Sequence, residues 1–145
     1  MIEAEWFSQR GLKEKDVNAV NPEGDCALIL ASRAGDADLI SELIEKGADI
    51  SAVDAYGNNA IWAACYAESE AVIRLLVASG CDINFRNPAG NTVMAYAASS
   101  GKDAIVHLLL ELGADPAIRN DDDMSALDLA ASLTSFKLLR AVSVA

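Results

Sequence analysis

The sequence predicts an all-α solenoid in which helix-turn-helix units stack side by side. The first observation is a period of 33 residues: "GDCALILASRAGDADLISELIEKGAD" begins at Gly24, and related segments begin at Gly57 and Gly90. The second is that apolar residues recur at helical spacing twice within each unit. The third is glycine placed between and after these apolar runs. A fixed period of this length is typical of a solenoid, because one unit cannot bury its apolar stripe alone.

The N-terminal segment matches only the end of a unit. Residues 16–18 correspond to residues 49–51 one period later, so we expect residues 2–13 to form a capping helix. The apolar residues that would face the first unit are Ile2, Trp6 and Phe7.

The unit that begins at Gly90 shows both predicted helices most clearly. Small apolar residues predict a short first helix, and an i, i+1, i+3, i+4 stripe predicts an amphipathic second helix. These residues are Met94, Ala97 and Ala98, and then Ile105, Val106, Leu108 and Leu109. Asn91 and Thr92 lie where an N-cap belongs, and Gly113 lies where a left-handed residue ends the second helix.

A hairpin-like finger is expected between successive helix pairs. An extended stretch, "ADPAIRN", follows the second helix, and turns begin at Asn87 and Asn120. Gly90 can take the positive φ that such a turn needs.

Three columns of residues, one period apart, predict the core of the stack. They are Leu28, Ile61, Met94 and Leu127; Ala31, Ala64, Ala97 and Ala130; and Leu43, Leu76, Leu109 and Val142. Large and small side chains alternate between columns, as close helix packing requires.

The pattern "G-x-T-x-L-x-x-A-A-x-x-G" followed by "I-V-x-L-L-L-x-x-G-A-D" resembles the ankyrin repeat, and the resemblance covers residues 12–142. It implies an ankyrin-type helical solenoid in one domain, residues 1–145. The full repeats are expected at residues 21–53, 54–86 and 87–119, with an N-terminal capping half-repeat at 1–20 and a C-terminal capping repeat at 120–145.

The sequence departs from the family pattern at several positions. The usual "TPLH" is replaced by "CALI", "NAIW", "TVMA" and "SALD", so the hydrogen bonds of that tetrapeptide should be changed and stability lowered. Glu68 replaces the glycine found at Gly35, and we expect it to reshape the turn between two helices. Asp123 replaces the glycine found at Gly90, where aspartate tolerates left-handed geometry.

Composition excludes several classes of partner. The net charge of -11 repels nucleic acid and anionic membranes, so a protein with a basic surface is the better partner. No segment approaches the roughly 20 apolar residues of a membrane span. The first residues lack a secretory signal, and Cys26, Cys65 and Cys81 suit buried, reduced thiols, so we expect a cytoplasmic protein. We also expect the protein to be monomeric when unbound.

No residues have the spacing of a catalytic, cofactor or metal site. The one histidine, His107, falls between core positions of a second helix and is expected on the solvated back face. The segment "NDDDMS" lacks the alternating ligands and terminal glutamate of a calcium loop. We expect no enzymatic activity, no cofactor and no bound metal.

The resemblance implies that partners dock on the finger tips and on the exposed side of the first helices. Trp, Tyr and Arg, the residue types enriched in interface hot spots, recur at these positions. The expected protein-binding residues are Arg33, Tyr56, Asn58, Trp62, Tyr66, Arg86, Asn91, Arg119, Asp121, Asp122 and Met124. A competing interpretation of Trp62 is that it fills a gap in the core.

Arg86 and Arg119 stand one period apart, just before two finger turns. One interpretation is that both guanidiniums project in parallel and bind carboxylates of a partner. The other is that each balances nearby acid: Arg119 with Asp121 and Asp122, and Arg86 with Asp54.

Two functional hypotheses follow. The first is a non-enzymatic interaction module or adaptor that binds a protein through its concave face and finger tips. The second is an acidic inhibitor or immunity-type protein that blocks a basic, nucleic-acid-binding partner. The second would lose affinity steeply with salt, because exposed charges are screened.

Overall fold

A computed structural model describes residues 4–13 and 16–143 of the chain. Within these residues the secondary structure is helical, with two isolated β-bridges, Val20 to Cys26 and Val53 to Asn59, and no strand. The chain divides into two compact units, Met1–Cys81 and Asp82–Ala145, here called unit 1 and unit 2. The prediction of an all-α helical fold is confirmed.

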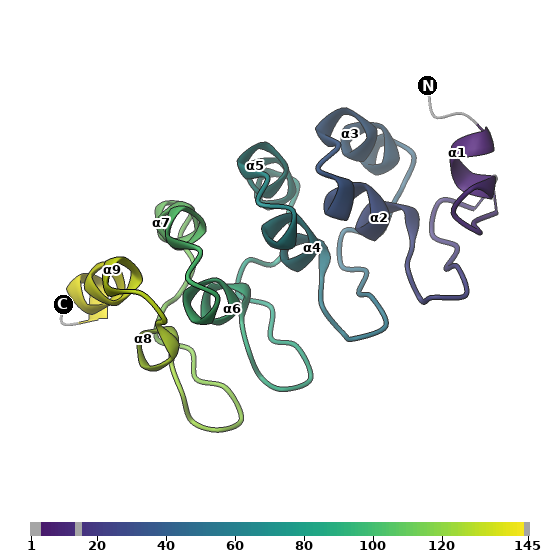
Figure 1. The fold of residues 1–145 in the computed structure, drawn as a ribbon. Coiled ribbons are helices and arrows are strands. Elements are labelled where there is room, and N and C mark those ends of the chain that lie inside the picture. The colour runs from purple at the N-terminus through teal and green to yellow at the C-terminus, as the bar shows by residue number, and fades with distance from the viewer. Residues whose placement is uncertain (1–3, 14–15, 144–145) are drawn as a thin grey trace. The chain divides into compact units, whose positions relative to one another are not determined.

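Unit 1 holds a short N-terminal helix and two helix pairs (Figure 1). The helices are α1 (Ala4–Ser8), α2 (Ala27–Ala34), α3 (Ala37–Glu45), α4 (Ala60–Tyr66) and α5 (Glu70–Ala78). The first helices α2 and α4 pack together, the second helices α3 and α5 pack together, and each pair packs internally. Each pair lies within one of the predicted repeats.

Unit 2 repeats this arrangement with two further helix pairs. They are α6 (Val93–Ser99) with α7 (Asp103–Glu111), and α8 (Ala126–Leu129) with α9 (Leu133–Ser143). Helix α6 packs against α8, and α7 packs against α9. That residues 1–145 form a single domain stays a prediction.

The N-terminal helix ends earlier than the sequence predicts. Among the described residues it covers Ala4–Ser8 and does not reach residue 13, and Ile2 lies outside these residues. Phe7 is buried, and the Arg10 guanidinium lies 4.3 Å from the centroid of the half-buried Trp6 ring.

The predicted core columns hold through the first three full repeats and fail in the last. Leu43, Leu76 and Leu109 are fully buried, but Val142 is 44% exposed and Leu139 is fully buried instead. The cause is a shortened first helix: α8 has four residues, and α9 begins 30 residues after α7 rather than 33. The expectation for Val142 is therefore wrong.

Three of the four repeats carry a capping side chain at the position of the family threonine. Asn59, Thr92 and Ser125 are N-caps whose side chains accept backbone N–H bonds at the starts of α4, α6 and α8. Cys26 caps α2 without a side-chain hydrogen bond. One repeat thus keeps the threonine cap, two replace it with asparagine or serine, and one lacks a side-chain cap.

The turn at Glu68 is not reshaped, contrary to expectation. Glu68 has φ 55°, close to the 71° of Gly35 in the preceding repeat. The N–H of Glu68 donates to the Cys65 carbonyl at 3.0 Å, and the N–H of Gly35 makes the same type of bond at 3.2 Å. Packing of α4 on α5 enforces the turn, and Glu68 adopts a conformation that glycine would reach at lower cost. Asp123 has φ 61° in its finger, as expected.

The sequence correctly predicts the exposure of His107 and the burial of the three cysteines. His107 is exposed on α7, and Cys26, Cys65 and Cys81 are buried. No described helix is long and apolar enough to cross a membrane.

Candidate protein-binding surface

The four fingers are built on one repeated hydrogen-bond motif. An Asn or Asp begins each finger, and its side-chain oxygen accepts the backbone N–H groups two and four residues later. These residues are Asn21, Asp54, Asn87 and Asn120. Each finger is therefore a defined loop that fixes its tip, because both the amide and carboxylate side chains replace a backbone partner.

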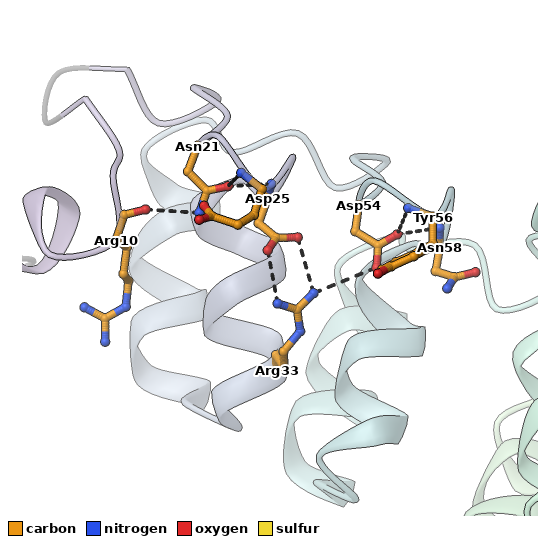
Figure 2. A network of polar contacts seen from close by, with 8 residues as sticks. Arg10, Asn21, Asp25, Arg33, Asp54, Tyr56 and Asn58 are labelled. Atoms are coloured by element: carbon orange, nitrogen blue, oxygen red, sulfur yellow. Dashed lines mark hydrogen bonds and ion pairs between the residues drawn. The ribbon is translucent and has the colours of Figure 1, made fainter.

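Arg33 connects two successive fingers of unit 1 (Figure 2). Its guanidinium, at the end of α2, contacts both carboxylate oxygens of Asp25, at 3.1 and 3.3 Å. The Asp54 Oδ2 atom of the next finger lies 3.8 Å from Arg33 Nη2. The side chains of both aspartates are only 11% exposed, and that of Arg33 is 39% exposed. Arg33 thus braces the fingers while part of it stays accessible.

The hydrogen bond to Asp25 is the main cause that raises the pKa of Arg33 above its ordinary value. The charges of Asp25 and Asp54 act in the same direction, whereas burial opposes them. The predicted binding residues Arg33 and Tyr66 stand one period apart on α2 and α4, which pack together.

Four large apolar side chains are exposed around this network. Tyr56 is 80% exposed at a finger tip, and Tyr66 is 70% exposed at the end of α4. Val20 and Val53, which precede the first two finger turns, are also exposed. We call Val20, Val53, Tyr56, Tyr66 and the accessible part of Arg33 the tyrosine surface. The two valines were not among the predicted binding residues.

Trp62 lies in the core of unit 1 and not on the tyrosine surface. The residue is 9% exposed, and its backbone N–H donates to the Asn59 side chain at 3.3 Å. Asn59 also donates to the Cys81 sulfur at 3.7 Å. This burial agrees with the competing interpretation, in which Trp62 fills a gap in the core. Asn58 is half-buried, and its backbone N–H donates to Asp54.

In unit 2 the two predicted arginines make contacts within the fingers. Arg86 Nε donates to the Gly90 carbonyl at 3.0 Å, and its Nη2 contacts Asp121 Oδ1 at 3.4 Å. Arg119 Nη1 donates to the Asp123 carbonyl at 2.8 Å and contacts Asp128 Oδ2 at 3.3 Å. Arg86 also donates to the backbone carbonyl of Arg119 at 3.2 Å.

As the second interpretation expects, each arginine contacts a nearby acid, but the aspartates are not the expected ones. Arg86 contacts Asp121, and Arg119 contacts Asp123 and Asp128. Neither pairing was anticipated, because Asp123 and Asp128 approach Arg119 only after the finger closes on itself.

The tip of the last finger is acidic and exposed. Asp121, Asp122 and Met124 are all solvent-accessible, and the predicted residue Asn91 accepts a hydrogen bond from Asn120 Nδ2 at 2.8 Å. Among the described residues, no group of three or more His, Cys, Asp or Glu side chains could hold a metal ion.

Repeated helix pairs joined by hydrogen-bonded fingers define a helical-repeat protein. The sequence matches the family model "Ankyrin repeats (3 copies)" over residues 5–87 and 70–143. The chain therefore belongs to the ankyrin repeat family, as its repeat pattern indicated. Members of this family are protein-protein interaction modules.

Among solved structures, the chain is similar to the ankyrin repeat domain of Bcl-3, which is described as a unique member of the IkappaB protein family. The two share 29% sequence identity with a TM-score of 0.81, over 86% of this chain and 55% of that chain. This chain thus spans about half the length of that structure. No curated protein matches the sequence.

Proposed function

We propose that this chain binds a protein partner through the tyrosine surface of unit 1. The observation that carries the proposal is the pair Tyr56 and Tyr66, which expose 80% and 70% of their surface beside a braced arginine. Aromatic side chains gain most from burial in an interface and lose little conformational entropy on binding. The finger fixes the backbone of Tyr56, whose N–H donates to Asp54, before a partner arrives, which reduces the entropic cost of association.

Arg33 gives this surface a polar element. Its contacts with Asp25 and Asp54 fix the guanidinium, so a partner carbonyl or carboxylate meets a positioned donor rather than a flexible one. The partner surface that fits best is apolar at its centre, with a hydrogen-bond acceptor near Arg33. Net charge of -11 adds long-range attraction to basic partners.

Affinity capture with quantitative mass spectrometry tests the proposal. The Tyr56→Ala/Tyr66→Ala variant should capture about tenfold less partner than wild type, because two hot-spot aromatics are removed. The matched control is Arg74→Ala/His107→Ala, which changes two exposed residues of second helices and should leave capture within about twofold. Equal capture by wild type and the tyrosine variant would contradict the proposal.

Salt dependence separates this function from the acidic-inhibitor hypothesis. Binding driven by the tyrosines should weaken only modestly between about 50 and 500 mM salt, because apolar burial is not screened. An inhibitor that imitates nucleic acid through its carboxylates would lose most of its affinity over the same range. A steep loss would therefore favour that second function.

A further inference from the structure

Helix α9 exposes a stripe that is both apolar and basic. Leu133 is 66% exposed and Phe136 is 39% exposed, and Lys137 and Arg140 are also exposed. These four residues have i, i+3, i+4, i+7 spacing, which places them on one side of the helix. We call them the α9 stripe. The Arg140 guanidinium lies 6.0 Å from the centroid of the Phe136 ring, so one cation adjoins the apolar part.

Phe136 occupies a stacking position of the solenoid. Leu43, Leu109 and Leu139 are fully buried equivalents on the second helices α3, α7 and α9. The residues three positions earlier are Ile40, Val106 and Phe136. Val106 and Ile40 are also fully buried, on helices that pack against the second helix of the following repeat. Phe136 holds the equivalent position on α9 but remains exposed, so a further helix could pack on it.

The charge of the α9 stripe is opposite to that of the chain. Helix α9 contains two bases and no acid, whereas the whole protein has a net charge of -11. The two cations flank the exposed Leu133 and Phe136.

We propose that the α9 stripe binds an acidic amphipathic helix of a separate protein, packed along α9. Apolar residues of the bound helix would cover Leu133 and Phe136, and its carboxylates would contact Lys137 and Arg140. This surface lies on α9 and is independent of the tyrosine surface of unit 1.

A second copy of this chain fits the stripe poorly. A symmetric α9 contact would bring Lys137 and Arg140 toward the same two cations, and like charges across an interface are unfavourable. A head-to-tail contact would need exposed apolar residues on α1. Among its described residues, Phe7 is buried, and Trp6 is half-buried beside Arg10.

Two synthetic peptides test the proposal directly. Each has about 20 residues, which allows a stable helix, with leucine at i, i+3, i+4, i+7 positions and either glutamate or lysine beside them. Fluorescence anisotropy should show binding of the glutamate peptide to wild type, at least tenfold tighter than binding of the lysine peptide. The double variant Lys137→Glu/Arg140→Glu should reverse this preference.

A matched variant controls for the change in total charge. Lys46→Glu/Arg74→Glu reverses two exposed bases on unit 1 and alters the net charge by the same amount. It should retain the preference for the glutamate peptide, with affinity within about threefold of wild type after the global charge change. Phe136→Ala should weaken both peptides by about tenfold, with circular dichroism confirming the fold.

Three results would overturn the proposal. One is no binding of the glutamate peptide up to about 1 mM, the weakest affinity of interest. Another is an equal affinity for both peptides in the charge-reversed and wild-type proteins. The third is concentration-dependent self-association, detected by sedimentation, that Phe136→Ala abolishes, since it would assign the stripe to a second copy.

Discussion

Two substitutions in the last repeat test the position of α9 relative to the 33-residue period. A strict period would bury Val142, whereas the structure buries Leu139. Leu139 is fully buried, and leucine to alanine removes three carbons from that site. At about 0.8 kcal/mol per buried methylene, plus a term for the cavity, Leu139→Ala should lower the free energy of unfolding by about 2–4 kcal/mol. Val142 is 44% exposed and loses only two methyl groups, so Val142→Ala should cost less than about 1 kcal/mol.

Urea denaturation followed by circular dichroism measures both variants. The m-values must match wild type, because the two compact units could unfold separately and distort a two-state fit. Leu109→Ala serves as the internal standard, since Leu109 is fully buried in the preceding repeat. A larger loss for Val142→Ala than for Leu139→Ala would refute the shortened α8 and the shifted α9.

Three further substitutions test local features of the fold. Glu68→Gly should raise the free energy of unfolding by about 0.5–1 kcal/mol, because it relieves left-handed strain; destabilisation in thermal melts would contradict this. Gly90→Ala should cost at least about 1 kcal/mol more than Gly47→Ala, because both have positive φ but only a Cβ at Gly90 would meet other atoms, within 2.5–2.9 Å. Hydrogen bonds from two serines of the last repeat lower the pKa of Asp103, so its contribution to stability is present above the unfolded pKa of about 3.9 and lost as pH falls through the lower folded value. The stability difference between wild type and Asp103→Asn should therefore shrink with acidification; a constant difference would contradict the role of the carboxylate.

The repeat period predicts the helix pairs because it combines two physical requirements. Each unit needs an apolar stripe on each helix, and each needs small residues where neighbouring helices approach. Ala31, Ala64 and Ala97 satisfy the second requirement and are fully buried, as their column predicts. Equivalent positions keep their environment as long as the number of residues between the helices is constant.

The 33-residue period no longer predicts equivalent positions where the number of residues between the helices changes. The first helix of the last repeat ends at Leu129, and α9 begins at Leu133. Ser132 then donates to Asp103, and Ser135 Oγ donates to the same carboxylate at 2.7 Å, which fixes the earlier start of α9. A column alignment carries no information about such a deletion, because it assigns every residue by its position in the period alone.

For the binding residues too, the sequence predicts some features and not others. Exposure of Tyr56 and Tyr66 follows from their positions in the repeat, since both occupy columns at the finger tip and at the end of the first helix. The partners of Arg33, Arg86 and Arg119 do not follow from these positions. They depend on which finger carboxylates the folded loops bring near each guanidinium.

Site-specific photo-crosslinking tests the proposed function most directly. A photoreactive aromatic residue at position 56 or 66 replaces a side chain of the tyrosine surface, and the same residue at position 74 or 107 reports on exposed second helices. The proposal predicts that positions 56 and 66 form adducts with the same partner protein, and that positions 74 and 107 do not. Adducts formed at 74 or 107 but absent at 56 and 66 would contradict binding through the tyrosine surface.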